Sequence, residues 1–260
     1  MNYWQKIDQN PFSDLIWNLP EQPLGTLNLI GGNHNNFATE IKIAEFLLQT
    51  FRLKTLSVCL PETLQSQLPP LEHLTFLPAT PSGSFANSSQ LITLLQNADF
   101  NLLLGDFSKN STTAHAIFQA CSQSTTPLLL TRDTLDLIDS SPLEKLFIKD
   151  QLFIFTSLIQ LQKLFHTILY PKIILLSMSL LQTIETLHKF TLSYPLTIIT
   201  FHRQQLIIAH AGIVNSIPLE KTSYSPISLW NGELAAKIAI FNLFNPNNPL
   251  PATTSAIFYN

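Results

Sequence analysis

Two glycine-containing segments, far apart in the sequence, have the residue types that bind phosphate at the start of a helix. Gly31 and Gly32 follow the apolar stretch TLNLI and lead, after a short polar turn, into a helical pattern. Asn231 and Gly232 precede a second helical pattern whose first turn carries Glu233. Glycine lets the backbone approach a ligand closely, and a helix start offers unpaired amides and a positive dipole end. Both segments are therefore candidate anion sites.

Each segment also has a purely structural interpretation. The first is neither a complete dinucleotide fingerprint nor a Walker loop, and a tight turn between strand and helix explains its glycines equally well. A glutamate at position 233 is stabilised by the helix dipole whether or not it reacts. In the chemical alternative, backbone amides neutralise a phosphate while Glu233 takes a hydroxyl proton. Local sequence leaves both interpretations open.

Composition excludes several classes of partner. The chain has 260 residues, of which 45% are hydrophobic and 12% charged, and its formal net charge is −3 with no clustered Lys/Arg run. Nucleic acid is therefore not an expected partner. The very apolar region 152–190 is interrupted by Lys163 and Lys172 before about 20 apolar residues accumulate, so it predicts buried core and no membrane partner.

The cysteines and the N-terminal stretch indicate a cytoplasmic location. Cys59 and Cys121 lie far apart in apolar surroundings, which predicts buried thiols rather than a disulfide or a metal pair. The first residues show no apolar core followed by a small-residue cleavage site, so no signal peptide is expected. The seven histidines form no ligand pair, and no metal site is predicted. His202 and His210 flank an expected hairpin and are placed at the surface.

Short apolar runs alternate with helical patterns along most of the chain. Strands are expected at 26–30, 54–60, 73–77, 101–105, 127–131, 151–156 and 195–200, and helices at 36–51, 87–97, 111–122, 133–139, 158–167 and 173–190. This alternation is typical of a parallel sheet covered by helices. The segment 196–217 predicts two or three antiparallel strands. One domain spanning 1–260 is expected, with residues 1–24 as an N-terminal extension packed on it.

In this order the segments resemble the ribokinase-like superfamily, and most closely its ATP- or ADP-dependent NAD(P)H-hydrate dehydratases. LIGGNHNNFATEIKIAEFLL resembles the family's first Gly-Gly segment, NADFNLLLG keeps a later glycine, and LLLTRDTLDLI keeps an aspartate. The resemblance implies a three-layer α/β/α sandwich, with a mostly parallel sheet and an antiparallel edge. It also implies a set of substrate-binding residues: Gly31, Gly32, Asn33, Phe37, Gly105 and Asp133.

The resemblance is weaker in the segments that correspond to the family's nucleotide-binding motifs. Leu158 stands where the family has histidine, and Thr200 and Phe201 replace a Lys-Gly pair. The family's Gly-Thr-Gly-Asp signature corresponds to WNGE, which implies nucleotide contacts from Thr200, Asn231 and Gly232 and a catalytic base at Glu233. Glutamate in place of aspartate shifts the carboxylate by about 1 Å, and a shift of that size can cost on the order of a hundredfold in rate.

Three functions follow from these observations. The first is a divergent, dehydratase-like pseudoenzyme that binds a nucleotide or a phosphorylated metabolite with catalysis impaired or lost. The second is an active hydro-lyase or small-molecule kinase that uses ATP or ADP with Mg²⁺. The third is a structural subunit of a homo-oligomer.

Overall fold

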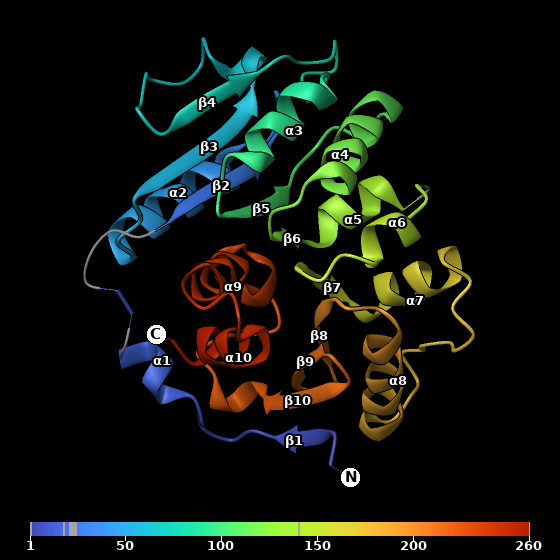
Figure 1. Cartoon of the computed structure of the whole chain (residues 1–260). Coiled ribbons are helices and arrows are strands. Elements are labelled where there is room, and N and C mark those ends of the chain that lie inside the picture. Colours follow the sequence, from blue (N-terminus) through green and yellow to red (C-terminus); the bar gives the residue numbers. More distant parts are fainter. Residues whose placement is uncertain (1, 18, 21–24, 140, 260) are drawn as a thin grey trace. The chain divides into compact units, whose positions relative to one another are not determined.

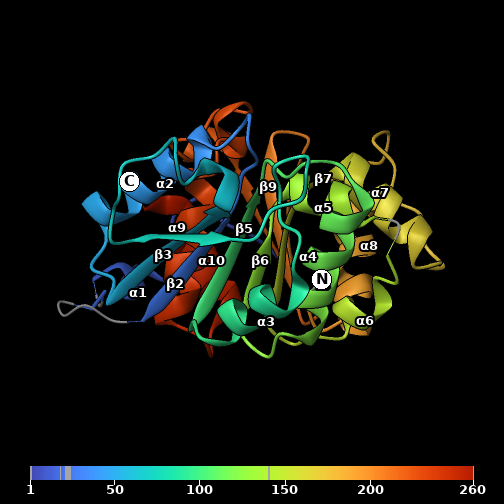
Figure 2. The same ribbon diagram turned by 90° about the horizontal axis from the view of Figure 1, so that it is seen from above.

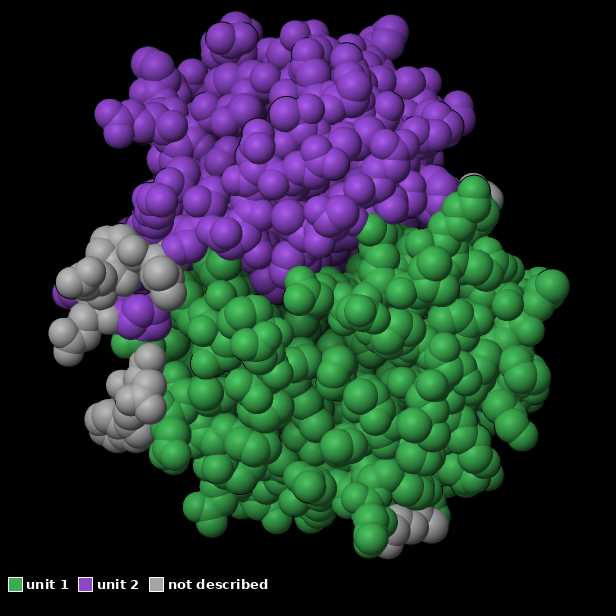
Figure 3. All heavy atoms as spheres, in the orientation of Figure 1, with its two compact units in different colours: residues 1–19, 142–260 green, residues 20–141 purple. Residues whose placement is uncertain are grey.

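The computed structural model describes residues 2–17, 19–20, 25–139 and 141–259, and the chain forms two compact units. Unit 1 consists of Met1–Leu19 and Pro142–Asn260, and unit 2 of Pro20–Ser141 (Figure 3). Each unit contains its own strands and covering helices. That the whole chain is one domain stays a prediction.

Unit 2 follows the alternating pattern of strand and helix that the sequence predicts. Its strands are β2 (Thr26–Gly31), β3 (Thr55–Pro61), β4 (Leu74–Leu77), β5 (Phe100–Gly105) and β6 (Leu128–Leu130). Its helices are α2 (Ala38–Thr50), α3 (Ser88–Gln96), α4 (Ser111–Gln123) and α5 (Arg132–Ile138), with a 3₁₀ turn at Glu62–Leu64.

The sheet of unit 2 is entirely parallel, in the order β6-β5-β2-β3-β4. Its direction of growth reverses at β2: the chain first moves outward to β3 and β4, then returns to β5 and β6. Because crossovers between parallel strands are right-handed, this reversal places α2 on one face and α3, α4 and α5 on the other (Figures 1 and 2). The central strands β2 and β5 are accordingly buried on both sides.

A pair of buried asparagines links the two central strands. Asn28 on β2 and Asn101 on β5 are register partners, and Asn28 Nδ2 donates to Asn101 Oδ1 over 2.9 Å. The two amides also donate to the carbonyls of Leu94 and Leu95 near the end of α3. Since buried polar groups must be satisfied, this network fixes both the register of the strands and the end of the helix.

Unit 1 combines parallel and antiparallel strands. Its strands are β1 (Trp4–Lys6), β7 (Leu152–Ser157), β8 (Thr197–His202), β9 (Gln205–His210) and β10 (Ile213–Pro218). Its helices are α1 (Ser13–Trp17), α6 (Glu144–Phe147), α7 (Leu158–Thr167), α8 (Leu180–Ser193), α9 (Glu233–Phe244) and α10 (Pro249–Phe258), with 3₁₀ turns at Leu219–Lys221 and Ser228–Trp230.

The strand order in unit 1 is β1-β10-β9-β8-β7. β7 and β8 are parallel, β8, β9 and β10 form an antiparallel meander, and β1 joins the edge in parallel with β10. α8 packs on β8, β9 and β10 from one side, while α10 packs on β9 from the other (Figure 1). The N-terminal strand therefore packs on this unit through β10.

The structure confirms every predicted strand and the antiparallel segment, with small shifts at the ends. The largest difference is α8, which begins at Leu180 instead of 173 because Ser179 and Gln182 form a capping box there. The N-cap of α4 is Asn110, whose side chain accepts a hydrogen bond from the Thr113 amide. Both cysteines are buried thiols. Within the described ranges, no helix has the length and apolarity needed to cross a bilayer.

The asparagine network generates a stability prediction. Asn101→Leu should lower the free energy of unfolding by roughly 1–3 kcal/mol, because it removes the acceptor of one Asn28 Nδ2 hydrogen bond and the bonds that Asn101 Nδ2 donates to the Leu95 carbonyl and Thr126 Oγ1. Urea denaturation measures the change, with the exposed α3 substitution Gln90→Leu as the control. A loss no larger than that of the control would show that the network is energetically neutral.

Candidate functional site

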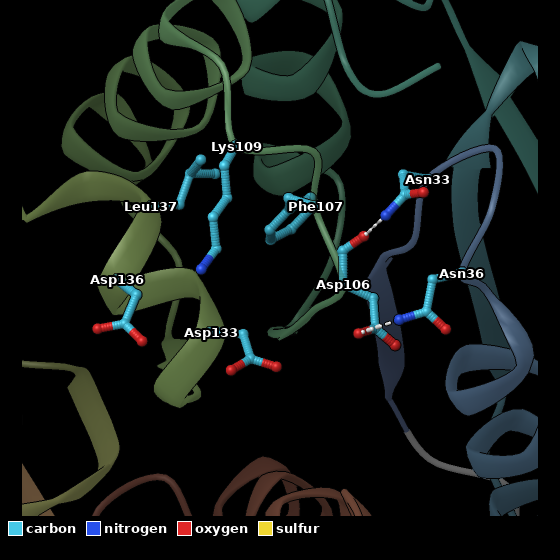
Figure 4. A pocket seen from close by; sticks show the side chains of 8 residues that line it. All are labelled: Asn33, Asn36, Asp106, Phe107, Lys109, Asp133, Asp136 and Leu137. Carbon is cyan, nitrogen blue, oxygen red and sulfur yellow. Dashed lines mark hydrogen bonds between the residues drawn. The ribbon is translucent and has the colours of Figure 1, made fainter. Parts of the chain in front are cut away.

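The carboxyl ends of three parallel strands bring polar loops together in unit 2. Asn33 and Asn36 follow β2, Asp106 follows β5, and Asp133 and Asp136 lie on α5, which follows β6. With Phe107, Lys109 and Leu137 they line a pocket of about 210 Å³ (Figure 4). Ligands of open α/β sheets bind at this edge, near the strand where the direction of growth reverses. Here that strand is β2.

Glycines at the ends of β2 and β5 make the close packing of these loops feasible. A Cβ at Gly31 would overlap Oε1 of Glu40 and lie 2.8 Å from the carbonyl oxygen of Gly105. Gly105 has φ of +114°, and a Cβ there would lie 2.6 Å from Cβ of Asp133. Any larger residue at either position would have to displace an acidic side chain or the neighbouring strand.

The backbone amides of the Gly-Gly turn already donate hydrogen bonds within unit 2. All the backbone N–H groups of residues 32–36 donate hydrogen bonds. Gly32 N–H donates to the Gly105 carbonyl over 2.9 Å, and Asn33 and Asn36 bond to each other's carbonyls over 2.8 and 3.1 Å. A phosphate at this turn would have to break these bonds, so the geometry disfavours the anion-binding interpretation of the turn itself.

Asp106 is held in an unusual backbone conformation with its carboxylate at the pocket. Its φ of +55° lies in the left-handed region, which is uncommon for a residue other than glycine. Asn36 Nδ2 donates to Asp106 Oδ1 over 2.6 Å, and Asn33 Nδ2 donates to the Asp106 carbonyl. Burial raises the pKa of Asp106, the charge of Asp133 adds to the rise, and a hydrogen bond from Thr39 opposes it.

Glu40 is a buried acid that sequence reasoning missed. Its side chain is 0% exposed, and no well-formed hydrogen bond reaches either carboxyl oxygen from the described residues. Burial raises the pKa of Glu40 to about 8. The charges of Asp106 and Asp133 add to the rise, whereas the backbone amides of Glu40 and Gly32 oppose it. At neutral pH the carboxyl group is therefore mostly protonated.

A sequence signal for Glu40 did exist. The buried positions of α2 are 40, 43, 44 and 47, which is the spacing of one helix face. Glu40 occupies the first position of a stripe that is otherwise Ile, Ala and Leu. A charged residue inside an apolar stripe is a candidate for an unusual environment.

The pocket is acidic and polar rather than phosphate-like. Three aspartates line it against one lysine, Lys109, and Glu40 lies close enough for its pKa to be raised by Asp106 and Asp133. Across the part of the chain that the structure describes, His, Cys, Asp and Glu side chains form no group of three able to hold a metal ion. These groups can accept hydrogen bonds from hydroxyl or N–H donors of a ligand.

The second predicted segment starts α9 in unit 1. Gly232 is its N-cap with φ of +93°, and Asn231 Oδ1 accepts a hydrogen bond from the Glu233 amide over 3.0 Å. Trp230 stacks on Phe155 of β7, with ring centroids 5.0 Å apart. This stacking places the start of α9 beside the carboxyl end of β7.

Thr200 lies on the strand next to β7. It pairs in register with Thr156, is 0% exposed, and its Oγ1 has no partner among the described residues. Thr156 Oγ1 donates to Gln160 Oε1 over 3.0 Å. The two neighbouring strands thus carry paired threonines, of which the Thr156 hydroxyl is engaged within the protein and the Thr200 hydroxyl has unused hydrogen-bonding capacity.

The basic residue of α9 is engaged in packing. Lys237 is 7% exposed, and its Nζ donates to the carbonyl of Tyr259 over 2.6 Å and lies 5.5 Å from the ring centre of Tyr224. Burial lowers the pKa of Lys237 and raises that of Tyr224, and the charge of Glu233 raises both. Lys237 therefore supports the fold around the α9 start.

The structure groups the predicted site residues by unit. The six predicted substrate residues, Gly31, Gly32, Asn33, Phe37, Gly105 and Asp133, all lie at the carboxyl edge of the unit 2 sheet. The predicted catalytic and nucleotide residues, Glu233, Asn231, Gly232 and Thr200, all belong to unit 1. Their roles stay predictions.

Of the two histidines expected at the surface, His210 is half-buried, with its Nδ1 2.9 Å from Thr197 Oγ1, and His202 differs more. His202 was expected at the surface, but it is only 7% exposed, and its Nε2 lies 2.9 Å from the carbonyl oxygen of Met178. The loop before α8 covers it, which the hairpin pattern alone could not indicate. His34 is exposed, and its Nδ1 lies 3.1 Å from Gln67 Nε2.

No protein-family model and no curated protein matches this sequence. Solved structures do match its fold. The hypothetical protein SMU.573 from Streptococcus mutans aligns with a TM-score of 0.66 at 14% identity, covering 95% of this chain and 85% of that protein. A ribokinase-like superfamily protein from Enterococcus faecalis aligns with a TM-score of 0.65 at 15% identity, covering 98% and 86%.

A third similar structure has a named activity. The ADP/ATP-dependent NAD(P)H-hydrate dehydratase from Bacillus subtilis, co-crystallised with ATP and Mg²⁺, aligns with a TM-score of 0.61 at 13% identity. The alignment covers 95% of this chain and 84% of that enzyme. At such identities the similarity shows the fold, which is ribokinase-like. The predicted fold class is confirmed.

Glu40 generates a prediction on the pH dependence of stability. Because the pKa of Glu40 is about 8 in the folded chain and 4.5 in an exposed glutamate, the folded state holds one proton more between these pH values. The free energy of unfolding should therefore fall as pH rises from about 5 to 8, by a few kcal/mol at about 1.4 kcal/mol per pKa unit. Glu40→Gln, which cannot ionise, should flatten this slope.

The measurement is urea denaturation across that pH range. The exposed α2 substitution Glu45→Gln serves as the control and should leave the slope unchanged. Equal slopes in the wild type and Glu40→Gln would mean that Glu40 is ionised in the folded chain at neutral pH.

Proposed function

We propose that this chain is a divergent NAD(P)H-hydrate dehydratase-like protein that binds a nucleotide or a phosphorylated metabolite, with catalysis impaired or lost. The observation that carries the proposal is the polar pocket at the carboxyl edge of the unit 2 sheet. All six residues that the family resemblance assigns to substrate lie at that edge, two of them in its lining. A ribokinase-like fold supports the proposal, since the dehydratase from Bacillus subtilis shares it.

The start of α9 is the proposed phosphate contact. Gly232 provides a left-handed N-cap without a side chain, and the first turn of a helix of 12 residues follows it. One of its amides is already bonded to Asn231 Oδ1, so the remaining first-turn amides would contact the phosphate. Mg²⁺ would be held mainly by the phosphates of ATP or ADP, as is usual for this ion. In an active protein, Glu233 would accept the substrate proton.

Three features of unit 1 support impaired catalysis. Thr200, which replaces the lysine of the family pattern, is fully buried, so it supplies neither positive charge nor an exposed donor. Leu158, at the position of the family's histidine, is buried in the first turn of α7. Trp230 replaces a glycine and stacks on Phe155, which fills space beside the α9 start.

A specific observation favours assembly as a second candidate. The connection between α7 and α8 exposes Leu169 by 84% and Ile173 by 66%. Exposed apolar side chains that lie close together in the chain are more frequent at interaction surfaces than elsewhere. We therefore retain a homo-oligomeric structural subunit as the alternative function.

A thermal-shift screen against ATP, ADP, AMP, NADH and NADPH tests the proposal. A ligand that binds the folded state raises the melting temperature by mass action, and a ligand at 100 times its Kd adds about 2.7 kcal/mol of stability. Binding of at least one of these compounds is expected, with little or no turnover of hydrated NADH. The control variant is Glu185→Gln, which replaces an exposed acid on α8 and should shift with each compound as the wild type does.

Three results would change the proposal. Absence of any shift with these compounds would overturn nucleotide binding and favour the assembly role, which light scattering would then measure. Efficient turnover that Glu233→Gln reduces by about a hundredfold or more would establish an active enzyme. Turnover that Glu233→Gln leaves unchanged would remove Glu233 from the chemistry.

A further inference from the structure

The exposed apolar side chains are concentrated in one stretch of unit 1. Of the eleven large apolar side chains that are exposed among the described residues, seven lie between residues 148 and 192. Four of these seven belong to the end of α7, the connection after it and the start of α8 (Figure 1). We call them the α7–α8 patch: Leu169, Ile173, Leu176 and Leu181. Apolar side chains that gather in this way are typical of an interaction surface.

The connection that carries the patch is fixed to the rest of unit 1. Ile174 is fully buried and holds the middle of the connection down. Arg203 Nη2 donates to the carbonyl of Ser177 over 3.2 Å. His202 Nε2 lies 2.9 Å from the carbonyl oxygen of Met178. The exposed side chains are therefore presented by a backbone that has its own contacts with the sheet.

Leu169 occupies a position where glycine is usual. α7 ends in a Schellman motif, in which the Tyr170 amide donates to the Phe165 carbonyl over 2.8 Å and the Leu169 amide to the His166 carbonyl over 3.1 Å. Leu169 has φ of +52°, which is strained for a residue with a Cβ. Its side chain is exposed, so it brings this strain without packing in the core. An outlier of this kind points to a contact outside the chain.

The stretch around the patch is basic, although the chain as a whole is acidic. Residues 151–219 hold four basic residues and one acidic residue, a formal charge of +3, whereas the rest of the chain holds ten basic and sixteen acidic residues, a charge of −6. The five charged residues of the stretch are Lys163, Lys172, Lys189, Arg203 and Glu185. Glu185 is already paired with Lys189 over 2.6 Å. A partner of this surface is therefore expected to be negatively charged.

Composition and charge distinguish a lipid surface from a protein partner. Protein interfaces favour Trp, Tyr and Arg at their centres, whereas the patch consists of leucine and isoleucine. The aromatic residue of the connection, Tyr170, packs on Phe165 of α7, with ring centroids 5.0 Å apart. In a symmetric dimer the patch would face its own copy and bring like charges together. Apolar side chains flanked by lysine suit the headgroup region of an anionic bilayer.

We propose that the α7–α8 patch docks on an anionic phospholipid bilayer. Leu169, Ile173 and Leu176 reach the boundary between headgroups and acyl chains, and the exposed Lys172 contacts the phosphates. Such a contact needs no spanning segment, so it departs from the sequence-based expectation of no membrane partner without requiring a longer apolar run. The inference goes beyond nucleotide binding, and it assigns the patch to a lipid surface rather than to a second copy of the chain.

Sedimentation of the full chain with lipid vesicles is the test. Binding is expected to vesicles of equal parts phosphatidylcholine and phosphatidylglycerol, with much weaker binding to phosphatidylcholine alone, and added salt should weaken it. The double variant Ile173→Asn with Leu176→Asn should bind about tenfold to a hundredfold more weakly, because two apolar side chains no longer insert. The matched control is Leu48→Asn, which replaces an exposed leucine of α2 and should bind as the wild type does.

Two single variants test the roles of Leu169 and Lys172. Leu169→Gly should weaken binding about tenfold without lowering the melting temperature, since glycine suits the backbone conformation there. Lys172→Glu should weaken binding to the anionic vesicles about tenfold. Lys42→Glu, the same charge change on the exposed face of α2, should have little effect.

Several results would overturn the proposal. They are absence of vesicle binding, equal binding to both kinds of vesicle, unchanged binding of the double variant, and equal weakening by Leu48→Asn. Light scattering without lipid provides the remaining arm. Self-association that the double variant abolishes, in a chain that does not bind vesicles, would replace the lipid contact with a homo-oligomer interface.

Discussion

The architecture of unit 2 depends on an uncharged carboxyl group packed where two strands end. Glu40 fits there only because Gly31 has no side chain, which also lets the carbonyl oxygen of Gly105 on β5 come close, while Gly105 leaves room for Asp133. The protonated form is favoured because burial penalises the charged form. Glycine at the end of a strand is usually associated with a phosphate site, but Gly31 makes room for the carboxyl group of Glu40.

The two candidate segments differ in what they leave open to a ligand. In unit 2 the amides of residues 32–36 hold the loop together, and the side chains of Asn36 and Asp106 line the pocket instead. In unit 1, Trp230 precedes the start of α9 and stacks on Phe155, while Thr200 is buried on β8. The glycines of the family pattern are thus partly retained while their neighbours have changed.

Sequence predicted the strands well because their apolar runs are strong and local, as in FNLLLG or LFIFTS. The residues that the family resemblance assigns to substrate lie at one edge of the unit 2 sheet, since parallel strands share one carboxyl edge. Sequence missed Glu40 because burial of an acid depends on what packs against it, here two glycines and a loop from a strand 60 residues on. It misplaced His202 for the same reason, because the loop that covers it is irregular.

The edge strand of unit 1 has a consequence for biosynthesis. β1 lies at the N-terminus, but its partner β10 is made about two hundred residues later, as the bond from Trp4 to Ser216 shows. On the ribosome, β1 therefore emerges long before the strand that it pairs with, and the strands of unit 2 are made in between. Its backbone groups on the β10 side have only water as a partner until β10 has been made.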